Sequence, residues 1–480
     1  MSPPPTVHVI GGGLAGCEAA WQAASHGVPV TIHEMRPVRS TEVHRTDRLG
    51  ELVCSNSLRG DKLDNAVGLL KAEMRRLGSL ILRVADLVRV PAGAALAVDR
   101  DRFAEHITAA VAGHPLVTVV REEIETVAGL GDAASPLLIA SGPLTAPALS
   151  EEIARLVGRP HLSFYDAVSP IVLADSIDHQ RVFRASRWDR SLTAGVVAQD
   201  AGRDVGQDVG RGFSPAVGAG LQARPTDGDY LNCPFTEAEY ARFYEALRGA
   251  DLVPLREVED PRFFEGCLPI EVMAGRGRDT LRYGPMKPVG LVDPRTGRRP
   301  FAVVQLRQDD LAAEHYSMVG FQTRMKRGEQ SRVFRLVPGL EHAEFVRYGL
   351  VHRNTYIDGP AALAETGQLR SDPRVFFAGQ VSGVEGYVES AASGLLAGIN
   401  AARFAAGRPA VSPPRTTAIG ALAYYVSHAS PADFQPSNIT FGIMTPLEQV
   451  DRRLRRDRLA RNEAISARAL GDLDRWIGSL

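Results

Sequence analysis

The sequence has few cysteines and no long apolar stretch. Only four cysteines occur among 480 residues, and none stands in a Cys-x-x-Cys pair. This disfavours a zinc site or a thioredoxin-type motif, and widely spaced thiols fit a reducing cytoplasm better than a disulfide-rich protein. No apolar run approaches the roughly 20 residues of a membrane span, and Met1 to Thr6 carry no basic targeting segment. We therefore expect a cytoplasmic protein that uses neither a metal nor a membrane.

The chain also lacks an excess of either charge. Lys plus Arg number 55 and Asp plus Glu number 56, so the molecule as a whole is not a polybasic nucleic-acid binder. An RNA partner would have to be held by local basic islands, although most charge runs are simply solvated surfaces. The islands present are Arg276, Arg278, Arg282 and Lys287, then Arg324, Lys326 and Arg327, and finally Arg452, Arg453, Arg455, Arg456 and Arg458.

A glycine-rich loop near the start of the chain stands between a strand pattern and a helix pattern. Residues 7–10 are apolar and β-branched, residues 17–24 favour a helix, and residues 28–34 read as a second strand. The loop itself is Gly11-Gly12-Gly13-Leu14-Ala15-Gly16. Its G-x-G-x-x-G spacing permits a tight turn, the close approach of a pyrophosphate, and close packing of the helix on the strand.

A carboxylate completes this nucleotide-binding pattern. Glu34 ends the second strand, where it can accept hydrogen bonds from ribose hydroxyls. Together the elements predict a dinucleotide site with its phosphates at the helix N-terminus. An S-adenosylmethionine methyltransferase fold also combines a glycine loop with a distal acid, and it is the alternative at this point.

Two later segments favour FAD over that alternative. FAD is longer than one βαβ unit can hold, so flavoproteins often return a second strand near the C-terminus. Residues 375–379 form such a strand, followed by a glycine turn and a helix over 389–404, and residues 138–143 resemble the turn beside FAD phosphates. We expect the six loop residues together with Glu34, Gly379 and Gln380 to contact the cofactor.

Three further segments carry a resemblance to a known family. They are residues 51–59 with Cys54, residues 229–236 with Cys233, and residues 351–356. With the glycine loop, the chain resembles the folate- and FAD-dependent tRNA (uracil-5-)-methyltransferases over nearly its whole length, apart from about 188–228. A related flavoprotein family that modifies the wobble uridine of tRNA shares the glycine loop but not these two cysteine contexts.

The resemblance implies a reductive methylation of RNA. Methylenetetrahydrofolate (the 5,10 form) would give the carbon, NADH or NADPH would give electrons through FAD, and C5 of the T-loop uridine in tRNA would accept the methyl group. Thiolate chemistry fits, because uracil C5 is a poor nucleophile until a group adds at C6. By family match, Cys233 is the expected attacker on C6 and Cys54 its partner at the flavin. We expect Cys17 and Cys267 to be buried packing residues instead.

The resemblance also suggests an architecture and a binding surface. We expect an α/β, Rossmann-like FAD-binding domain that is discontinuous, over residues 1–187 and 331–480, with an Arg-rich helix at its end. A smaller α+β domain over residues 188–330, starting with a Gly- and Asp-rich loop, would be inserted. Tyr356 would stack near the flavin or pterin, or else pack at an interface. The basic islands would bind tRNA phosphates.

Two other functions remain open from the sequence. One keeps the chemistry but acts on a uridine of ribosomal RNA. The other is a non-catalytic protein that binds FAD and RNA. The paired cysteine contexts favour an enzyme, because a binding module has no need of thiols.

Overall fold

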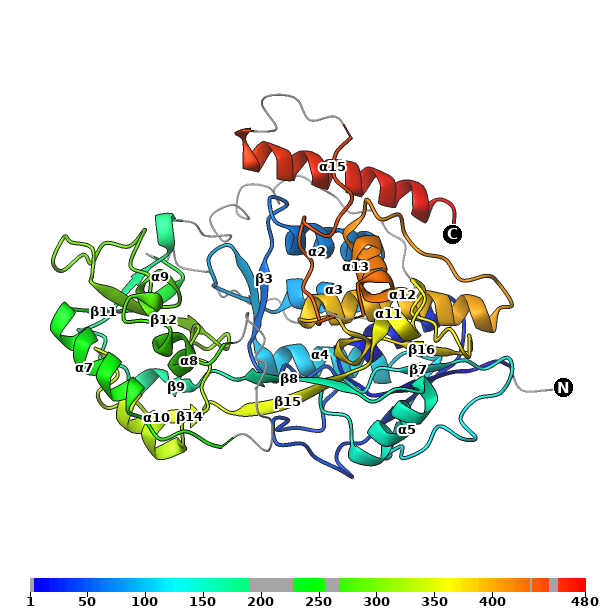
Figure 1. Ribbon diagram of the computed structural model, residues 1–480, viewed down its shortest axis with the longest axis horizontal. Coiled ribbons are helices and arrows are strands. Elements are labelled where there is room, and N and C mark those ends of the chain that lie inside the picture. Colours follow the sequence, from blue (N-terminus) through cyan, green and yellow to red (C-terminus); the bar gives the residue numbers. More distant parts are fainter. Residues whose placement is uncertain (1–3, 190–227, 255–267, 432–433, 449–455) are drawn as a thin grey trace.

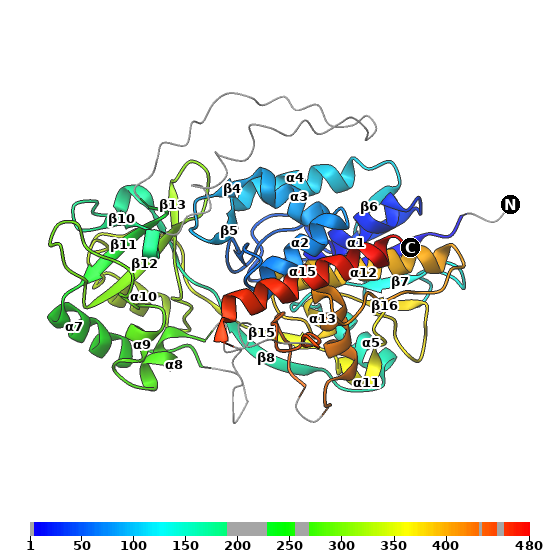
Figure 2. The same ribbon diagram turned by 90° about the horizontal axis from the view of Figure 1, so that it is seen from above.

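A computed structural model describes residues 4–189, 228–254, 268–431, 434–448 and 456–480. Two parts lie side by side along the long axis of the molecule (Figure 1). The larger part contains the segments from both ends of the chain, and the smaller part comes from the middle. The same two parts are separate when the molecule is seen from above (Figure 2).

The larger part is built on a parallel five-stranded sheet. Its strands run in the order β16, β7, β1, β2, β6, and every neighbouring pair is parallel. Strands covered on both faces read as continuous apolar runs, which explains their sequences. The bounds are Val375–Phe377 (β16), Leu137–Ile139 (β7), Val7–Ile10 (β1), Val30–Glu34 (β2) and Val117–Arg121 (β6). The predicted Rossmann-like fold is confirmed, and β16 makes it discontinuous in sequence.

Two helices of this part pack with their backbones in contact. A Cβ atom on Gly394 of α12 (Tyr387–Ala405) would lie 2.2 Å from the Ala15 carbonyl oxygen of α1 (Leu14–Ser25). One on Gly398 would lie 2.4 Å from that of Ala19. The Gly- and Ala-rich composition of α12 is therefore required by the helix that follows the glycine loop.

Other helices and a small sheet complete the larger part. The helices are α2 (Ala66–Arg76), α3 (Leu80–Leu87), α4 (Arg100–Ala112), α5 (Pro147–Val157), α11 (Gly359–Ala362), α13 (Ala418–His428) and α15 (Arg458–Ile477). The small sheet pairs β3 (Ser57–Gly60), β5 (Ala95–Val98) and β4 (Arg89–Val90). Among the described residues, no helix is both long and apolar enough to cross a membrane.

Buried carboxylates join helices that are distant in sequence. Glu18 on α1 accepts hydrogen bonds from the Ile81 N–H (2.9 Å) and from Ser79 Oγ (2.7 Å) at the start of α3. Glu73 on α2 accepts one from the Ala418 N–H (2.7 Å) at the start of α13. Each carboxylate supplies an acceptor that the N–H groups of a helix N-terminus lack within the helix.

The smaller part is built on an antiparallel six-stranded sheet with helices packed against it. The strand order is β10 (Phe183–Ala185), β11 (Tyr230–Phe235), β12 (Ala302–Gln308), β13 (His315–Met318), β9 (Ile171–Leu173) and β14 (Phe345–Arg347). The helices are α7 (Glu237–Arg248), α8 (Ile270–Gly275), α9 (Thr280–Tyr283) and α10 (Arg327–Phe334). Thr236 caps α7 and forms a capping box with Glu239.

A two-stranded ribbon joins the two parts. Strands β8 (Leu162–Ala167) and β15 (Val351–Tyr356) pair antiparallel and run side by side from one part to the other (Figure 1). Strands β9, β10 and β14 lie outside the predicted insert of residues 188–330, yet they belong to its sheet. We propose wider limits for the inserted unit, from β9 to β14, because separating these strands from their sheet would leave unpaired edges.

Candidate active site

The glycine loop between β1 and α1 contains two glycines that close contacts require. Gly11 has a φ of +102°, and a Cβ there would lie 2.5 Å from the Ala140 carbonyl oxygen after β7. A Cβ on Gly16 would lie 1.9 Å from the Gly11 carbonyl oxygen. A Cβ on Gly13 would meet nothing within 4 Å. The absent side chain of Gly13 therefore leaves open space at the N-terminus of α1, where phosphates bind favourably.

A cavity that is open to solvent lies in front of this loop. It is lined by residues 10–15, residues 33–36 at the end of β2, residues 140–146 after β7, and Gly379 and Gln380 after β16. These positions follow the carboxyl ends of parallel strands, where such sheets bind nucleotides. The structure thus brings together Glu34, Gly379, Gln380 and every residue of the predicted loop except Gly16, which is buried behind it.

Glu34 is held in place by hydrogen bonds from two residues. Its Oε2 accepts the Gly12 N–H (2.7 Å), and its Oε1 accepts the backbone N–H (3.0 Å) and Nε–H (2.8 Å) of Arg36. Burial opposes ionisation, but the hydrogen bonds and charge of Arg36 outweigh it and lower the pKa of Glu34. The carboxylate is therefore ionised, and its oxygens keep lone pairs for ribose hydroxyls.

Gly379 closes the cavity from the side of β16. Its φ is +78°, and a Cβ there would meet the Cβ of Ala15 at 2.9 Å. Its N–H donates to Ser393 Oγ (2.8 Å), and the neighbouring Gln380 side chain donates to Glu385. The second strand expected from the sequence thus reaches the glycine loop directly.

Tyr356 lies away from the residues that line this cavity. The residue is 5% exposed, and its ring packs edge-on against Phe434, with 6.0 Å between ring centroids. Leu162 and Tyr425 pack against the same pair. The geometry fits the packing role better than stacking on a flavin.

Cys54 lies beside the cavity, in contact with Tyr387. The N–H groups of Cys54 (2.7 Å) and Ser55 (3.2 Å) donate to Tyr387 Oη, and this hydroxyl donates to Cys54 Sγ (3.0 Å). Val53 and Tyr387 line the cavity, and Cys54 is half-buried. The structure therefore places this thiol next to the cavity that the glycine loop lines.

Arginines from both parts of the molecule hold the loop that carries Cys54. Arg100 of α4 donates to the carbonyl oxygen at position 52 (2.8 Å), and Arg347 of β14 donates to that at position 53. Arg307 of β12 donates to Asn56 Oδ1 (2.8 Å) and to the hydroxyl of the preceding serine (2.8 Å). The loop is thus fixed at the junction between the two sheets.

Positive charge is in excess around Cys54. Arg100 forms two hydrogen bonds of 3.0 Å with Asp309. Across the described ranges, no carboxylate pairs with Arg307 or with Arg347, which is only 8% exposed. Burial and the neighbouring guanidinium groups lower the pKa of Arg347 to about 10. Such surroundings favour an anion, including a thiolate.

Cys233 lies on the face of the inserted sheet that points away from the Cys54 loop. Side chains alternate along β11, and Asn232 accepts a hydrogen bond from Gln305 (2.9 Å) on the face that also carries Arg307. Cys233 points the opposite way and is fully buried in the hydrophobic core of the smaller part. Burial raises the pKa of its thiol. The structure therefore does not bring Cys233 together with Cys54.

Comparison with known proteins shows what this chain is related to. The family described as "Glucose inhibited division protein A" matches residues 6–203 and 216–409. A protein of Symbiobacterium thermophilum named "Methylenetetrahydrofolate--tRNA-(uracil-5-)-methyltransferase TrmFO" is 55% identical over 474 residues, which cover 98% of this chain and 97% of that protein. A protein of Heliobacterium modesticaldum with the same name is 53% identical over 473 residues, 98% of each chain. The chain belongs to the TrmFO family.

Solved structures support the same fold. GidA of Aquifex aeolicus aligns with a TM-score of 0.63 at 16% sequence identity, over 98% of this chain and 73% of that chain. At this identity the likeness shows the fold alone. The TrmFO relatives confirm the resemblance that the cysteine segments carry. The family match supports the relation to the flavoprotein family that shares the glycine loop.

The remaining cysteines of this TrmFO chain have packing roles or lie outside the description. Cys17 is fully buried on α1, and its Sγ donates to the Gly12 carbonyl oxygen (3.2 Å). Burial raises its pKa, as suits a packing residue. Cys267 lies outside the described residues. Within those residues, no group of three or more His, Cys, Asp or Glu side chains is placed to hold a metal ion.

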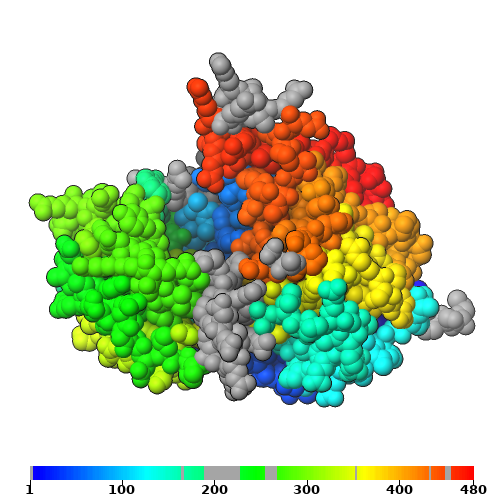
Figure 3. Space-filling view, viewed as in Figure 1, coloured from blue at the N-terminus to red at the C-terminus, as the bar shows by residue number. Residues whose placement is uncertain are grey.

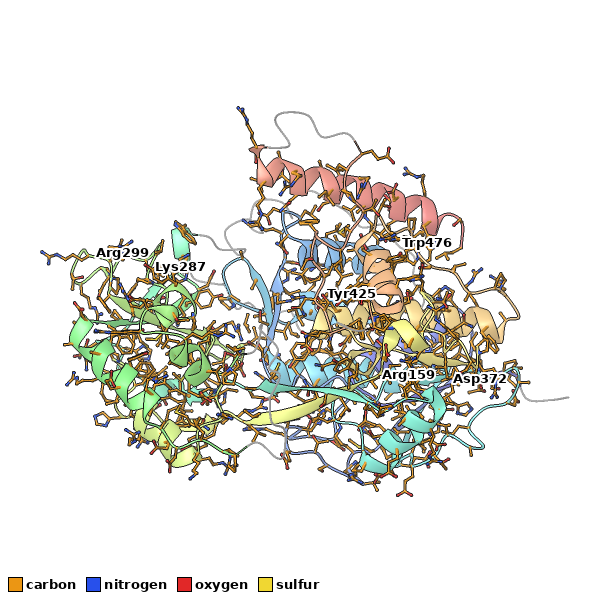
Figure 4. All side chains as sticks on the ribbon, viewed as in Figure 1. Arg159, Lys287, Arg299, Asp372, Tyr425 and Trp476 are labelled. Carbon is orange, nitrogen blue, oxygen red and sulfur yellow. The ribbon has the colours of Figure 1, made fainter. Side chains whose placement is uncertain are left out.

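The basic islands are partly neutralised. Residues of the first two islands form ion pairs that include Arg278–Glu237 (3.9 Å), Arg282–Asp279 (2.7 Å) and Lys326–Asp251 (3.2 Å). Lys287 lies on the smaller part, on the same side as the exposed Arg299 (Figure 4). Arg276 and Arg324 also belong to this part, whereas residues 452, 453 and 455 of the third island lie outside the described residues.

The side chains that hold Cys54 were not predicted from the sequence. Tyr387 directly follows the predicted glycine turn, and this position was the available signal. The arginines at positions 100, 307 and 347 carry no local signal, because only folding brings them to the loop. Arg36, two residues after Glu34, was also missed, although it pairs with Glu34 (2.8 Å).

Proposed function

We propose that this TrmFO protein transfers the one-carbon unit of 5,10-methylenetetrahydrofolate to C5 of the T-loop uridine in tRNA, with electrons from NADH or NADPH through FAD. The names of its relatives give the folate donor and the tRNA acceptor. The observation that carries the proposal is a dinucleotide cavity next to a thiol. Tyr387 lines that cavity and donates a hydrogen bond to Cys54 Sγ (3.0 Å).

FAD fits the residues that line the cavity. Gly13 leaves space beside the N-terminus of α1, whose N–H groups favour a pyrophosphate. The ionised Glu34 suits ribose hydroxyls, and the segments 140–146 and 379–380 would hold the remainder of the cofactor. When bound, FAD supplies the redox chemistry that converts a methylene carbon to a methyl group.

The chain itself contributes a thiol for addition to uracil. Uracil C5 becomes nucleophilic only after a nucleophile adds at C6, and a thiolate suits that addition. Cys54 is half-buried and close to guanidinium groups, so this arrangement supports it as the partner thiol beside the cofactor. Cys233 remains the proposed attacker on C6 because its sequence context matches the family, but its sulfur must leave the hydrophobic core to reach a base.

We place the RNA in the hollow between the two parts. Figure 3 shows this hollow between the green surface of the smaller part and the orange surface of the larger part, with blue N-terminal residues at its floor. Strand β3, which follows the Cys54 loop, lies at this junction (Figure 1). The proposed phosphate contacts are Arg276, Arg278, Arg282, Arg324 and Lys326, together with Arg452 and Arg455.

An isotope experiment tests the proposal. A labelled methylene carbon on tetrahydrofolate should appear in tRNA as 5-methyluridine, and only when NADH or NADPH is present. Labelled S-adenosylmethionine should leave the tRNA unlabelled, because the proposed carbon donor is folate. S-adenosylmethionine would deliver a complete methyl group and would need no flavin. Label from S-adenosylmethionine, or transfer from folate without a reductant, would contradict the proposal. Ribosomal RNA as a parallel acceptor separates the two RNA targets.

A further inference from the structure

One tyrosine joins the dinucleotide cavity to the Cys54 loop. Tyr387 is the first residue of α12, after the N-cap Gly386, and lines the cavity. Its Oη accepts the N–H groups of Cys54 (2.7 Å) and Ser55 (3.2 Å). Because both N–H groups donate to Oη, its own hydrogen points at Cys54 Sγ, and the distance from Oη to Sγ is 3.0 Å.

The hydroxyl remains a donor while the thiol ionises. Burial and the neighbouring Cys54 raise the pKa of Tyr387 well above its ordinary value, so the phenol keeps its proton. Guanidinium groups also face Cys54 from three other elements. They belong to Arg100 of α4, Arg307 of β12 and Arg347 of β14. These groups favour negative charge near the sulfur, whereas the tyrosine hydroxyl gives it a directed partner.

We propose that Tyr387 is a positioning residue that holds Cys54 as a thiolate at the edge of the cavity. The proposal rests on the proposed function only in taking Cys54 as the thiol that acts beside the cofactor. A hydrogen bond to a charged acceptor is roughly twice as strong as one between neutral groups, so the hydroxyl stabilises the thiolate more than the thiol. A purely structural tyrosine, which only fixes the loop through its two N–H contacts, would leave the ionisation of the thiol unchanged.

The test measures alkylation of Cys54 by iodoacetamide against pH in the FAD-loaded protein, with the modified peptide quantified by mass spectrometry. Tyr387→Phe keeps the ring and removes only the hydroxyl. Because the thiolate then loses a donor, we expect the midpoint of the alkylation profile to rise by about one pH unit. Below the midpoint this is roughly a tenfold slower reaction. A profile that coincides with that of the unmodified protein would overturn the proposal.

Two further variants keep the test decisive. Fluorotyrosine at position 387 preserves the shape of the side chain but is a stronger acid and donor, so the midpoint should fall. Tyr425→Phe is the matched control, because that hydroxyl donates to the Gln435 carbonyl oxygen (2.8 Å) outside the cavity, and its profile should not move. If Tyr387→Phe fails to fold, an unchanged fluorotyrosine profile alone refutes the proposal.

The alkylation profile is independent of methyl transfer, so the two proposals can fail separately. An unchanged profile in a protein that methylates tRNA refutes the role of Tyr387. A shifted profile in a protein that does not methylate RNA supports that role and refutes the proposed function.

Discussion

Apart from the carboxylate of Glu34, the parallel sheet forms its part of the site mainly with backbone atoms, whereas the inserted antiparallel sheet faces the junction with side chains. In the first region, Gly11 and Gly13 shape the cavity by the side chains they lack. In the second, Arg307 and Arg347 reach from strands to the loop that carries Cys54. A backbone site is damaged when atoms are added, and a side-chain site is damaged when atoms are removed. Substitutions in the two regions should therefore fail in different ways.

The largest expected effect is the loss of methyl transfer when Cys54 is substituted, because its surroundings differ from those of the two buried cysteines. Cys54→Ala should reduce methyl transfer at least about 10³-fold and change the free energy of unfolding by less than about 0.5 kcal/mol, because Cys54 is only half-buried. Cys17→Ala and Cys233→Ala should each cost about 1–2 kcal/mol, because both side chains are fully buried. Label incorporation and denaturant unfolding measure the two quantities. Equal stability losses at all three positions would contradict the expected difference between the half-buried cysteine and the two buried ones.

Two glycines of the same loop should differ in how much stability the protein loses when a methyl group is added. Gly11→Ala should cost about 3–5 kcal/mol of unfolding free energy, because its Cβ would lie 2.5 Å from a carbonyl oxygen at a positive φ. Gly13→Ala should cost less than about 1 kcal/mol, since a Cβ there meets nothing within 4 Å.

The larger substitution Gly13→Val extends this test to the cofactor. It should leave the protein folded but without FAD, as read from flavin absorbance, because the side chain enters the space left for the pyrophosphate. Full flavin content in folded Gly13→Val would show that the loop is not the cofactor site.

An ion pair between the two regions should be the next most sensitive feature. Arg100→Met leaves the buried Asp309 without its partner and should cost about 3 kcal/mol of unfolding free energy. Arg102→Met is the matched control on the same helix. Its side chain is 59% exposed and lies 3.9 Å from Asp99, so the change should be below about 0.5 kcal/mol. Similar losses for both variants would mean that the junction is not held by the buried pair.

The smallest effect concerns a helix that belongs to the smaller part alone. Thr236→Ala removes the capping box of α7 and should cost about 1 kcal/mol of unfolding free energy. FAD content and Cys54 alkylation should stay unchanged, because α7 does not line the cavity. A loss of flavin in this variant would show that the smaller part supports the cofactor site directly.

Features set by neighbouring residues could be predicted from the sequence. The glycine loop, Glu34 at a strand end, the Thr236 cap and the second strand before Gly379 depend on short segments with a fixed spacing, and all are found in the structure. Their physical cause is local, since turn geometry, strand alternation and helix termini act over a few residues.

Only the tertiary structure decided which side of an element each residue faces. The family match favoured a reactive Cys233, but alternation along β11 directs Cys233 and its polar neighbour Asn232 to opposite faces, and sheet packing made the face of Cys233 the core. Burial of Tyr356 against Phe434 likewise depends on a contact between distant segments. The partners of Cys54 come from α4, α12, β12 and β14, so no local pattern could assemble them.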